Sequence, residues 1–238
     1  MKRKFSRPQI NTVSLVAWYK LWAGLTTGTT VFDYSLNGND GTVVSAPPPV
    51  FPGFQLDGTA DYINTGASFQ STFKGNFSIC IWVKLDAAPP ASAGQLFGVR
   101  DGGNNIVGVY LNTQAGAGGR LTCNYKAGGN AAVFESQGDE TSTDWTLYTL
   151  TLDGSTNVLV YRDGILIVAQ GAKDGDMTGV TTTDYVNANT LFVGTRNNNG
   201  SANTFHKGTI GDFLIYSRAL SATEVKSIYE ISRWRYSI

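Results

Sequence analysis

The sequence predicts an all-β protein of one domain. Its 238 residues include 28 glycines, and only 15% are charged, which is typical of many short strands joined by tight turns. Hydrophobic residues make up 42% of the chain and aromatic residues 12%, enough for a sizeable core. All-β sandwiches commonly reach this length as a single unit, so we expect one domain.

Several segments combine alternating polarity with β-branched and aromatic residues, and each is predicted to be a strand: residues 14–21, 77–85, 105–111, 120–125, 145–152, 190–194 and 209–220. In residues 77–85 one face is wholly apolar, whereas the other carries Ser78, Cys80, Trp82 and Lys84. That pattern predicts a sheet with one core face.

A hairpin and one helix have the clearest local signals. Residues 157–170 predict a hairpin, because Asp163 and Gly164 can adopt the positive φ angles of a two-residue turn. Residues 221–231 predict a helix that begins with a capping box of Ser221 and Glu224. The apolar residues that follow at helical spacing predict that this helix packs one face on the sandwich.

Charge and cysteine content narrow the class of protein. The net charge is +0, but Lys2, Arg3, Lys4 and Arg7 concentrate positive charge at the start and leave the remainder net negative. We therefore expect no nucleic acid on the folded domain. No apolar run follows the basic start or is long enough to span a membrane, so neither standard secretion nor a membrane span is expected. For the two strand-borne cysteines, Cys80 and Cys123, the sequence favours buried free thiols over a disulfide.

The ordered motifs "LVAWYKL", "FDYSLNGNDGTV", "FQLDGTADYI", "FSICIWVKL" and "KGTIGDFLIYSRALSATEV" resemble the laminin G-like, concanavalin A-like lectin and glucanase family. The resemblance spans about residues 15–229 and implies a two-sheet antiparallel jelly-roll sandwich with one short C-terminal helix. It divides the chain into a basic arm (1–13), a laminin G-like domain (14–231) and a short tail (232–238). One departure is Gly211, where family members often carry an acid beside the residue equivalent to Asp212.

A calcium ion is one expectation of this resemblance. Asp33, Ser35 and Asn37 resemble the first half of an EF-hand loop, but Val44 stands where that loop needs a glutamate. Laminin G-like domains often hold one calcium at the rim of the sandwich, which implies a structural Ca²⁺ and no other cofactor here. Its implied ligands are Asp33, Asn39, Asp40 and Asp212. The alternative, which the Asn-Gly and Asp-Gly dipeptides favour, is a turn whose side chains bond its own backbone.

The sequence predicts a protein that is not an enzyme. Its four glutamates, Glu135, Glu140, Glu224 and Glu230, lack the alternating acids on one strand that related glucanases use. His206 is the only histidine, no nucleophile-elbow motif accompanies it, and we expect it to be a polar loop residue.

A sugar is the expected ligand, held by aromatic and amide side chains of the long strands. The candidate ligand-binding residues are Trp82, Arg100, Tyr110, Asn112, Asn124 and Lys126. Ordinary packing is the alternative for Trp82 and Tyr110.

Three functions follow, of which the first is preferred. It is a structural or adhesive virion protein, such as a bacteriophage capsid decoration or tail-appendage protein, assembled in the host cytoplasm and displayed on the virion surface. Its expected partners are capsid or appendage proteins, further copies of itself and host-surface glycans. Partner docking is assigned to Lys2, Arg3, Lys4, Arg7, Arg233, Trp234 and Arg235. The alternatives are an extracellular, cellular carbohydrate-binding lectin and, more remotely, a polysaccharide-active enzyme.

Overall fold

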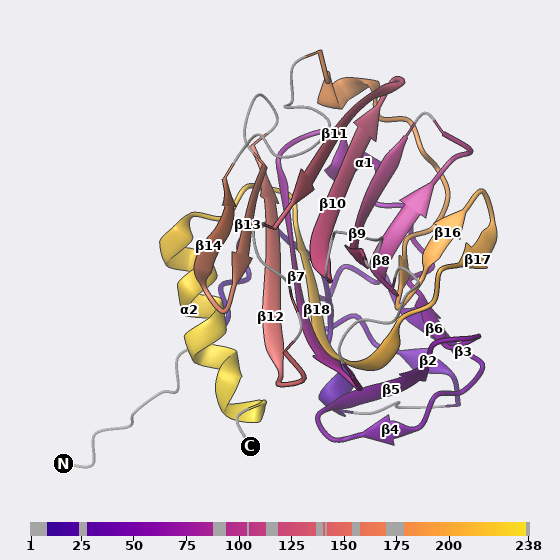
Figure 1. Ribbon diagram of the computed structural model, residues 1–238, viewed down its shortest axis with the longest axis vertical. Helices are drawn as coiled ribbons and strands as arrows, with labels where there is room; N and C mark the ends of the chain where they lie inside the picture. Colours follow the sequence, from indigo (N-terminus) through magenta and orange to yellow (C-terminus); the bar gives the residue numbers. More distant parts are fainter. Residues whose placement is uncertain are drawn as a thin grey trace.

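A computed structural model describes residues 9–23, 28–87, 94–103, 105–112, 119–136, 140, 142–153, 158–169 and 179–236. These residues form two sheets packed face to face, with the C-terminal helix lying outside them (Figure 1). Neighbouring strands are antiparallel except for the pair β8 and β16. The predicted all-β sandwich with a short C-terminal helix is therefore confirmed.

The first sheet carries the two longest described strands at its centre. Its members, in spatial order, are β14 (Ile165–Ala169), β13 (Val158–Arg162), β12 (Thr146–Leu152), β7 (Phe77–Leu85), β18 (Lys207–Tyr216), β5 (Gly53–Asp57) and β4 (Pro49–Val50), and β1 (Leu15–Tyr19) also pairs with β18. The predicted Asp163-Gly164 hairpin joins β13 and β14, and both turn residues have positive φ.

The second sheet contains more of the short strands. Its members are β11 (Asn130–Glu135), β10 (Arg120–Ala127), β9 (Ile106–Asn112), β8 (Gly94–Arg100), β15 (Phe192–Val193), β6 (Tyr62–Asn64), β3 (Gly41–Val44) and β2 (Thr30–Val31), with β16 (Arg196–Asn198) and β17 (Ser201–Asn203) attached at β8. The helices are α1 (Gln70–Phe73), α2 (Ala222–Ser232) and the short 3-10 helices η1 (Leu21–Ala23), η2 (Thr182–Asp184) and η3 (Arg233–Arg235).

The main core lies between the sheets. The apolar face of β7 points into it, and Phe77, Ile79, Ile81 and Val83 are all buried there, as their alternation predicts. Cys123 of the second sheet is buried in the same core, and both cysteines are free, as the sequence favours.

A second apolar cluster covers the outer face of the first sheet. Val225 and Ile228 of α2 pack there against Cys80 and Trp82 of β7. Full burial of each aliphatic side chain contributes about 1.5–3 kcal/mol. The prediction of a single core face is therefore incomplete. The second face of β7, which carries both polar and apolar residues, is largely buried beneath α2 (Figure 1).

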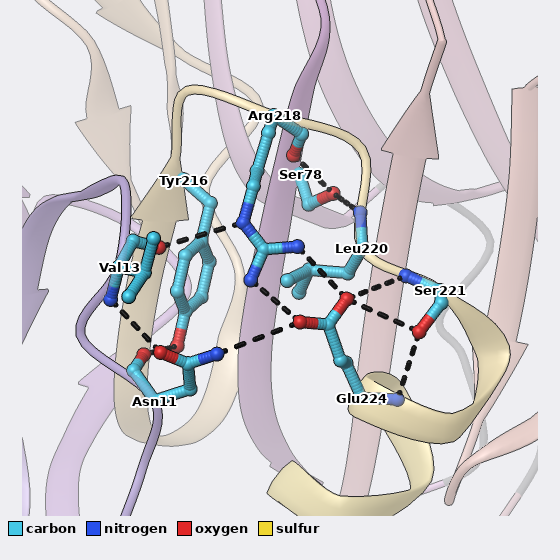
Figure 2. Close-up of polar contacts among 8 residues, drawn as sticks. All are labelled: Asn11, Val13, Ser78, Tyr216, Arg218, Leu220, Ser221 and Glu224. Carbon is cyan, nitrogen blue, oxygen red and sulfur yellow. Dashed lines mark hydrogen bonds and ion pairs between the residues drawn. The ribbon is translucent and has the colours of Figure 1, made fainter.

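Residues 9–13, the described end of the predicted arm, form an N-terminal strap against the start of α2 (Figure 2). Ile10 is buried in the outer cluster. The Tyr216 hydroxyl donates a hydrogen bond to the Asn11 carbonyl (3.0 Å), and the Asn11 amide donates one to Glu224 (3.5 Å). These contacts fix the strap against the domain.

Candidate functional site

A groove crosses the outer face of the first sheet beyond the end of α2. It consists of two adjoining cavities of about 340 and 570 Å³ that share Lys84, Asp144 and Trp145. We call it the cross-strand groove. Its aromatic end is lined by Trp82, Trp145, Tyr229 and Tyr236, and its polar end by Phe51, Gln55, Asp86 and Thr209.

Strand register explains why these side chains form a row. Lys84 of β7 pairs with Thr209 of β18, and Thr209 pairs with Gln55 of β5. On the other side of β7, Thr146 of β12 pairs with Val83, which places Trp145 beside Lys84. Four neighbouring strands thus contribute to one row that runs across the sheet for about 14 Å, given a strand spacing of about 4.8 Å.

Hydrogen bonds fix the polar end of the groove. The Thr209 hydroxyl donates to Gln55 Oε1 (2.7 Å), and Gln55 Nε2 donates to Asp86 Oδ1 (2.6 Å). A chain of this kind holds the amide in one orientation, so its neighbours present defined donors and acceptors. Phe51, 74% exposed, adds an apolar surface at the outer limit of the groove.

Aromatic packing builds the other end. The Trp82 ring stacks on Tyr236 with 4.2 Å between ring centroids, and its Nε1 donates a hydrogen bond to Ser232 (3.0 Å). Trp82 is only 2% exposed, so the prediction that it stacks on a ligand needs correction: the side chain is the buried floor beneath α2 and the tail. Trp145, whose ring centroid lies 4.8 Å from that of Tyr236, and Tyr229 are half-buried, and they are the aromatic side chains of this end that reach the surface.

The other predicted ligand residues lie on the second sheet, away from the groove. Arg100, Asn124 and Lys126 alternate with core residues of β8 and β10 and are half-buried on its outer face. Tyr110 and Asn112 pair in register with Thr122 and Arg120, and their side chains lie outside the described residues. The structure does not bring these five residues together with Trp82.

The predicted calcium ligands divide into a turn and a buried ion pair. Both Asp33 carboxylate oxygens accept hydrogen bonds within the loop, Oδ1 from the backbone N–H groups of Trp18 and Ser35 and Oδ2 from Asn39 N (3.1 Å). Asp40 Oδ1 accepts from Asp33 N (2.8 Å). The carboxylate oxygens of Asp33 and Asp40 thus already accept hydrogen bonds from the backbone of this loop. This is the arrangement expected of a turn whose side chains bond its own backbone.

Asp212 is not part of that loop network. It is fully buried and pairs with Arg235 (Nη2 to Oδ2, 2.5 Å), which corrects its assignment as a calcium ligand. Burial raises the pKa of Asp212, and the Arg235 guanidinium opposes this shift. No group of three or more His, Cys, Asp or Glu side chains within the described ranges is arranged to hold a metal.

The residues predicted to dock on a partner differ in how exposed the structure shows them to be. Lys2, Arg3, Lys4 and Arg7 lie outside the described residues. In the tail, Trp234 is 56% exposed and Arg233 pairs with Glu230 on the surface (2.9 Å). The Arg235 side chain is only 8% exposed because it reaches inward to Asp212, so its assignment to a docking surface is corrected.

Trp145, Gln55 and Thr209 are not among the site residues that the sequence predicts. A partial signal exists in β7, where Trp82 and Lys84 share the mixed face. The remaining residues come from three other strands, and only the pairing order β12-β7-β18-β5 brings them together. Such sheet order is a tertiary property that a single sequence does not encode locally.

A family model described as concanavalin A-like lectin/glucanases superfamily matches residues 57–226. The chain belongs to this concanavalin A-like superfamily. The resemblance inferred from the motifs is therefore confirmed. The comparison with curated proteins gives no match.

Solved structures place this concanavalin A-like chain among lectin-like folds. The binding domain of botulinum neurotoxin serotype D/C is similar with a TM-score of 0.67 and 14% identity, over 92% of this chain and 52% of that one. Trypanosoma rangeli sialidase in complex with sialic acid has a TM-score of 0.66 and 15% identity, over 97% and 35%. Botulinum neurotoxin type C, whose cell entry depends on interaction with two ganglioside molecules, has a TM-score of 0.65 and 14% identity, over 92% and 51%.

The concanavalin A-like chain thus spans about half the length of the neurotoxin chains and about a third of the sialidase chain. Identities this low show the fold alone, since one fold serves many functions. Within the described part of the chain, no helix has the length and apolar character needed to cross a membrane.

Proposed function

We propose that the protein is a non-catalytic, lectin-like adhesive protein that binds an extended glycan in the cross-strand groove. The observation that carries this proposal is the row formed by Trp145, Lys84, Thr209 and Gln55 across four strands. An aromatic face beside fixed amide, hydroxyl and carboxylate groups suits a sugar chain, which has apolar ring faces and many hydroxyls. The row is long enough for more than one sugar ring, and the hydrogen-bonded Gln55 presents its amide to the chain in one fixed orientation.

Comparison with similar folds supports the class of ligand. The solved structures include one in complex with sialic acid and a toxin described by its interaction with gangliosides. Those ligands belong to those proteins, and the groove described here has its own set of side chains. The proposal for this chain therefore rests on the geometry of the groove.

A glycan array with the full chain tests the proposal. We expect binding to one or more oligosaccharides, and a Trp145→Ala variant to lose at least tenfold in affinity for them, because it removes the aromatic surface. Lys126→Ala, on the outer face of the second sheet, is the matched control and should bind as the unchanged protein does. If Lys126→Ala lost glycan affinity and Trp145→Ala kept it, the glycan site would lie on the second sheet.

The placement of the glutamates supports a protein without catalytic activity. Among the described side chains that line the groove, the carboxylates are Asp86, already bonded to Gln55, and Asp144. Glu140 pairs with Arg162 and Glu224 with Arg218, both away from the groove. We expect no product when the protein is incubated with β-glucans or alginate, and any reducing sugar released above background would contradict this.

We further infer that the protein is displayed on the surface of a virion. The strap, which directly follows the basic residues in the sequence, is fixed on the domain, and the exposed Trp234 of the tail lines the same cavity as the strap. Tryptophan and arginine are favoured at the centres of protein interfaces. We infer that the arm and Trp234 dock on a capsid or appendage protein and that many displayed copies bind host glycans by avidity.

Co-sedimentation with candidate capsids tests this placement. The chain that starts at Gln9 removes the basic residues and keeps Ile10 and Asn11, so the strap and the outer cluster stay intact. We expect the full chain to sediment with particles and the shortened chain not to. If both chains bind glycans but neither binds particles, the extracellular lectin becomes the better description.

A further inference from the structure

A second cavity of about 290 Å³ lies on the other side of the C-terminal tail. It is bounded by the strap, by β1 and η1, and by the end of α2 with η3. Trp18, Trp22 and Trp234 line it together with Lys20 and Arg235, and we call it the tryptophan pocket. It is distinct from the cross-strand groove, which meets the tail at Arg233 and Tyr236.

Three of the residues that line this pocket carry a polar N–H group without a hydrogen-bond partner. Trp18 Nε1, Trp22 Nε1 and Arg235 Nε are buried atoms that make no hydrogen bond. The Trp22 indole lies near the Asp212 carboxylate, where it opposes the rise in the pKa of Asp212 that burial causes, so it has an acceptor close by. Trp18 and Arg235 remain as buried donors, and such donors in folded proteins nearly always have an acceptor.

The charged groups around the pocket leave it net positive. Lys20 Nζ lies 4.0 Å from the centroid of the Trp18 ring and 4.3 Å from that of Tyr34, which fixes the ammonium at the pocket. Arg235 lies over the Trp22 and Trp234 rings at 5.1 and 5.4 Å. The carboxylate of Asp212 balances one of these two cations. A ligand with one negative charge would balance the other.

We propose that the tryptophan pocket binds a sugar ring that carries a carboxylate. The Trp18 and Trp22 indoles offer flat surfaces for the ring, and the unpartnered Trp18 and Arg235 donors and the Lys20 ammonium offer contacts to the carboxylate. The volume is at the lower end of ligand pockets, which suits one ring. A dianionic phosphate fits less well, because Asp212 holds a negative charge beside Arg235.

Calorimetric titration of the full chain with methyl glucuronide tests this site. Methyl glucoside, which has the same ring without the charge, is the matched ligand, and glucose 6-phosphate tests the dianion. We expect saturable binding of the glucuronide, at least tenfold weaker binding of the phosphate, and no measurable binding of the glucoside. Equal binding of glucuronide and glucoside, tighter binding of the phosphate, or no binding of the glucuronide would overturn the proposal.

Two mild variants assign the binding to this pocket. Trp18→Phe keeps an aromatic ring and removes the N–H, and Lys20→Gln keeps a polar side chain of similar size and removes the charge. We expect each to weaken glucuronide binding at least tenfold with an unchanged circular dichroism spectrum. Lys226→Gln, on α2 beside the β13–β14 turn, and Trp145→Ala, in the cross-strand groove, should bind it unchanged. Unchanged binding by both pocket variants, or loss in Trp145→Ala, would overturn the assignment and leave the groove proposal standing.

Discussion

At the scale of single residues, Gly211 leaves the space that the C-terminal tail occupies. An added Cβ at Gly211 would lie 2.5 Å from the Tyr236 ring, closer than real Cβ contacts. Tyr236 in turn accepts a hydrogen bond from Asp212 N (2.7 Å) and stacks on Trp82. A side chain at position 211, acidic or otherwise, is therefore incompatible with the tail in its observed place.

His206 gives a pH prediction of the same scale. The sequence analysis expects a polar loop residue, but the side chain is 1% exposed, with Nε2 unpartnered. Burial lowers its pKa from 6.5 to about 4, so the unfolded chain takes up the proton first. The stability that this difference contributes is fully present above pH 6.5 and is lost as the pH falls through about 4, a change of about 3 kcal/mol.

We therefore expect the free energy of unfolding of the unchanged protein to fall between pH 6.5 and 4 more steeply than that of His206→Gln. Because His206 is the only histidine, the difference between the two slopes isolates it. Denaturant unfolding at several pH values within this window measures both slopes. Parallel curves would show that the imidazole titrates at its ordinary pKa, and hence that it is solvated.

At the scale of elements, α2 is held at its start by a polar cluster that links three segments (Figure 2). Glu224 completes the capping box with Ser221 and forms a two-point contact with Arg218 (2.7 and 2.8 Å). The Ser78 hydroxyl accepts from Leu220 N (2.9 Å) and so ties the turn before α2 to β7. The helix start, the turn after β18 and the strap thus share one network.

Glu224→Gln tests this network. Mainly through the hydrogen bonds from Arg218, the pKa of Glu224 is lowered from 4.5 to about 2. We expect the variant to lose up to about 1 kcal/mol of unfolding free energy at pH 7, the usual size for a partly exposed ion pair, because Gln keeps the oxygen that accepts the capping-box hydrogen bond. A carboxylate with a depressed pKa contributes above its unfolded pKa, so the difference should shrink from pH 4.5 to about 2.

Denaturant unfolding at pH 7 and pH 2 measures that difference. Glu230→Gln is the matched control, because Glu230 of α2 forms an exposed pair with Arg233 just beyond the end of the helix, and it should change stability by less than about 0.5 kcal/mol. A Glu224→Gln deficit that persists in full at pH 2 would mean that packing, and not charge, causes it.

At the scale of the whole molecule, the sandwich and its outer layer use the two faces of the first sheet differently. The inner face is apolar and packs on the second sheet. The outer face is divided between α2, the tail and the cross-strand groove. The groove and the tryptophan pocket lie on either side of the tail, so the position of η3 shapes both.

Stability of the whole domain also tests the calcium expectation. The carboxylate of Asp33 already accepts backbone N–H groups, and Asp212 is bound to Arg235. We expect the same melting temperature in millimolar calcium and in EDTA. A rise of several degrees with calcium would show an ion bound in the native state, because a ligand that binds only the folded form stabilises it.

The sequence by itself determined the fold class, the long strands, the Asp163-Gly164 hairpin and the capped helix. These features follow from alternation, turn chemistry and capping, which act between residues close in the chain. Strands β8 and β11 have no counterpart among the predicted strands, because a bulge interrupts alternation between Gln95 and Phe97 and because β11 is rich in alanine. The sequence also placed Trp82 on a mixed face but not beneath a helix.

Only the tertiary structure decided the candidate sites. Gln55, Lys84, Trp145 and Thr209 are far apart in sequence and meet because four strands pair in one order and register. Asp212 and Arg235 meet because the tail folds back along β18. Long-range pairing, which depends on the packing of the entire chain and not on local preference, assembled both the cross-strand groove and the tryptophan pocket.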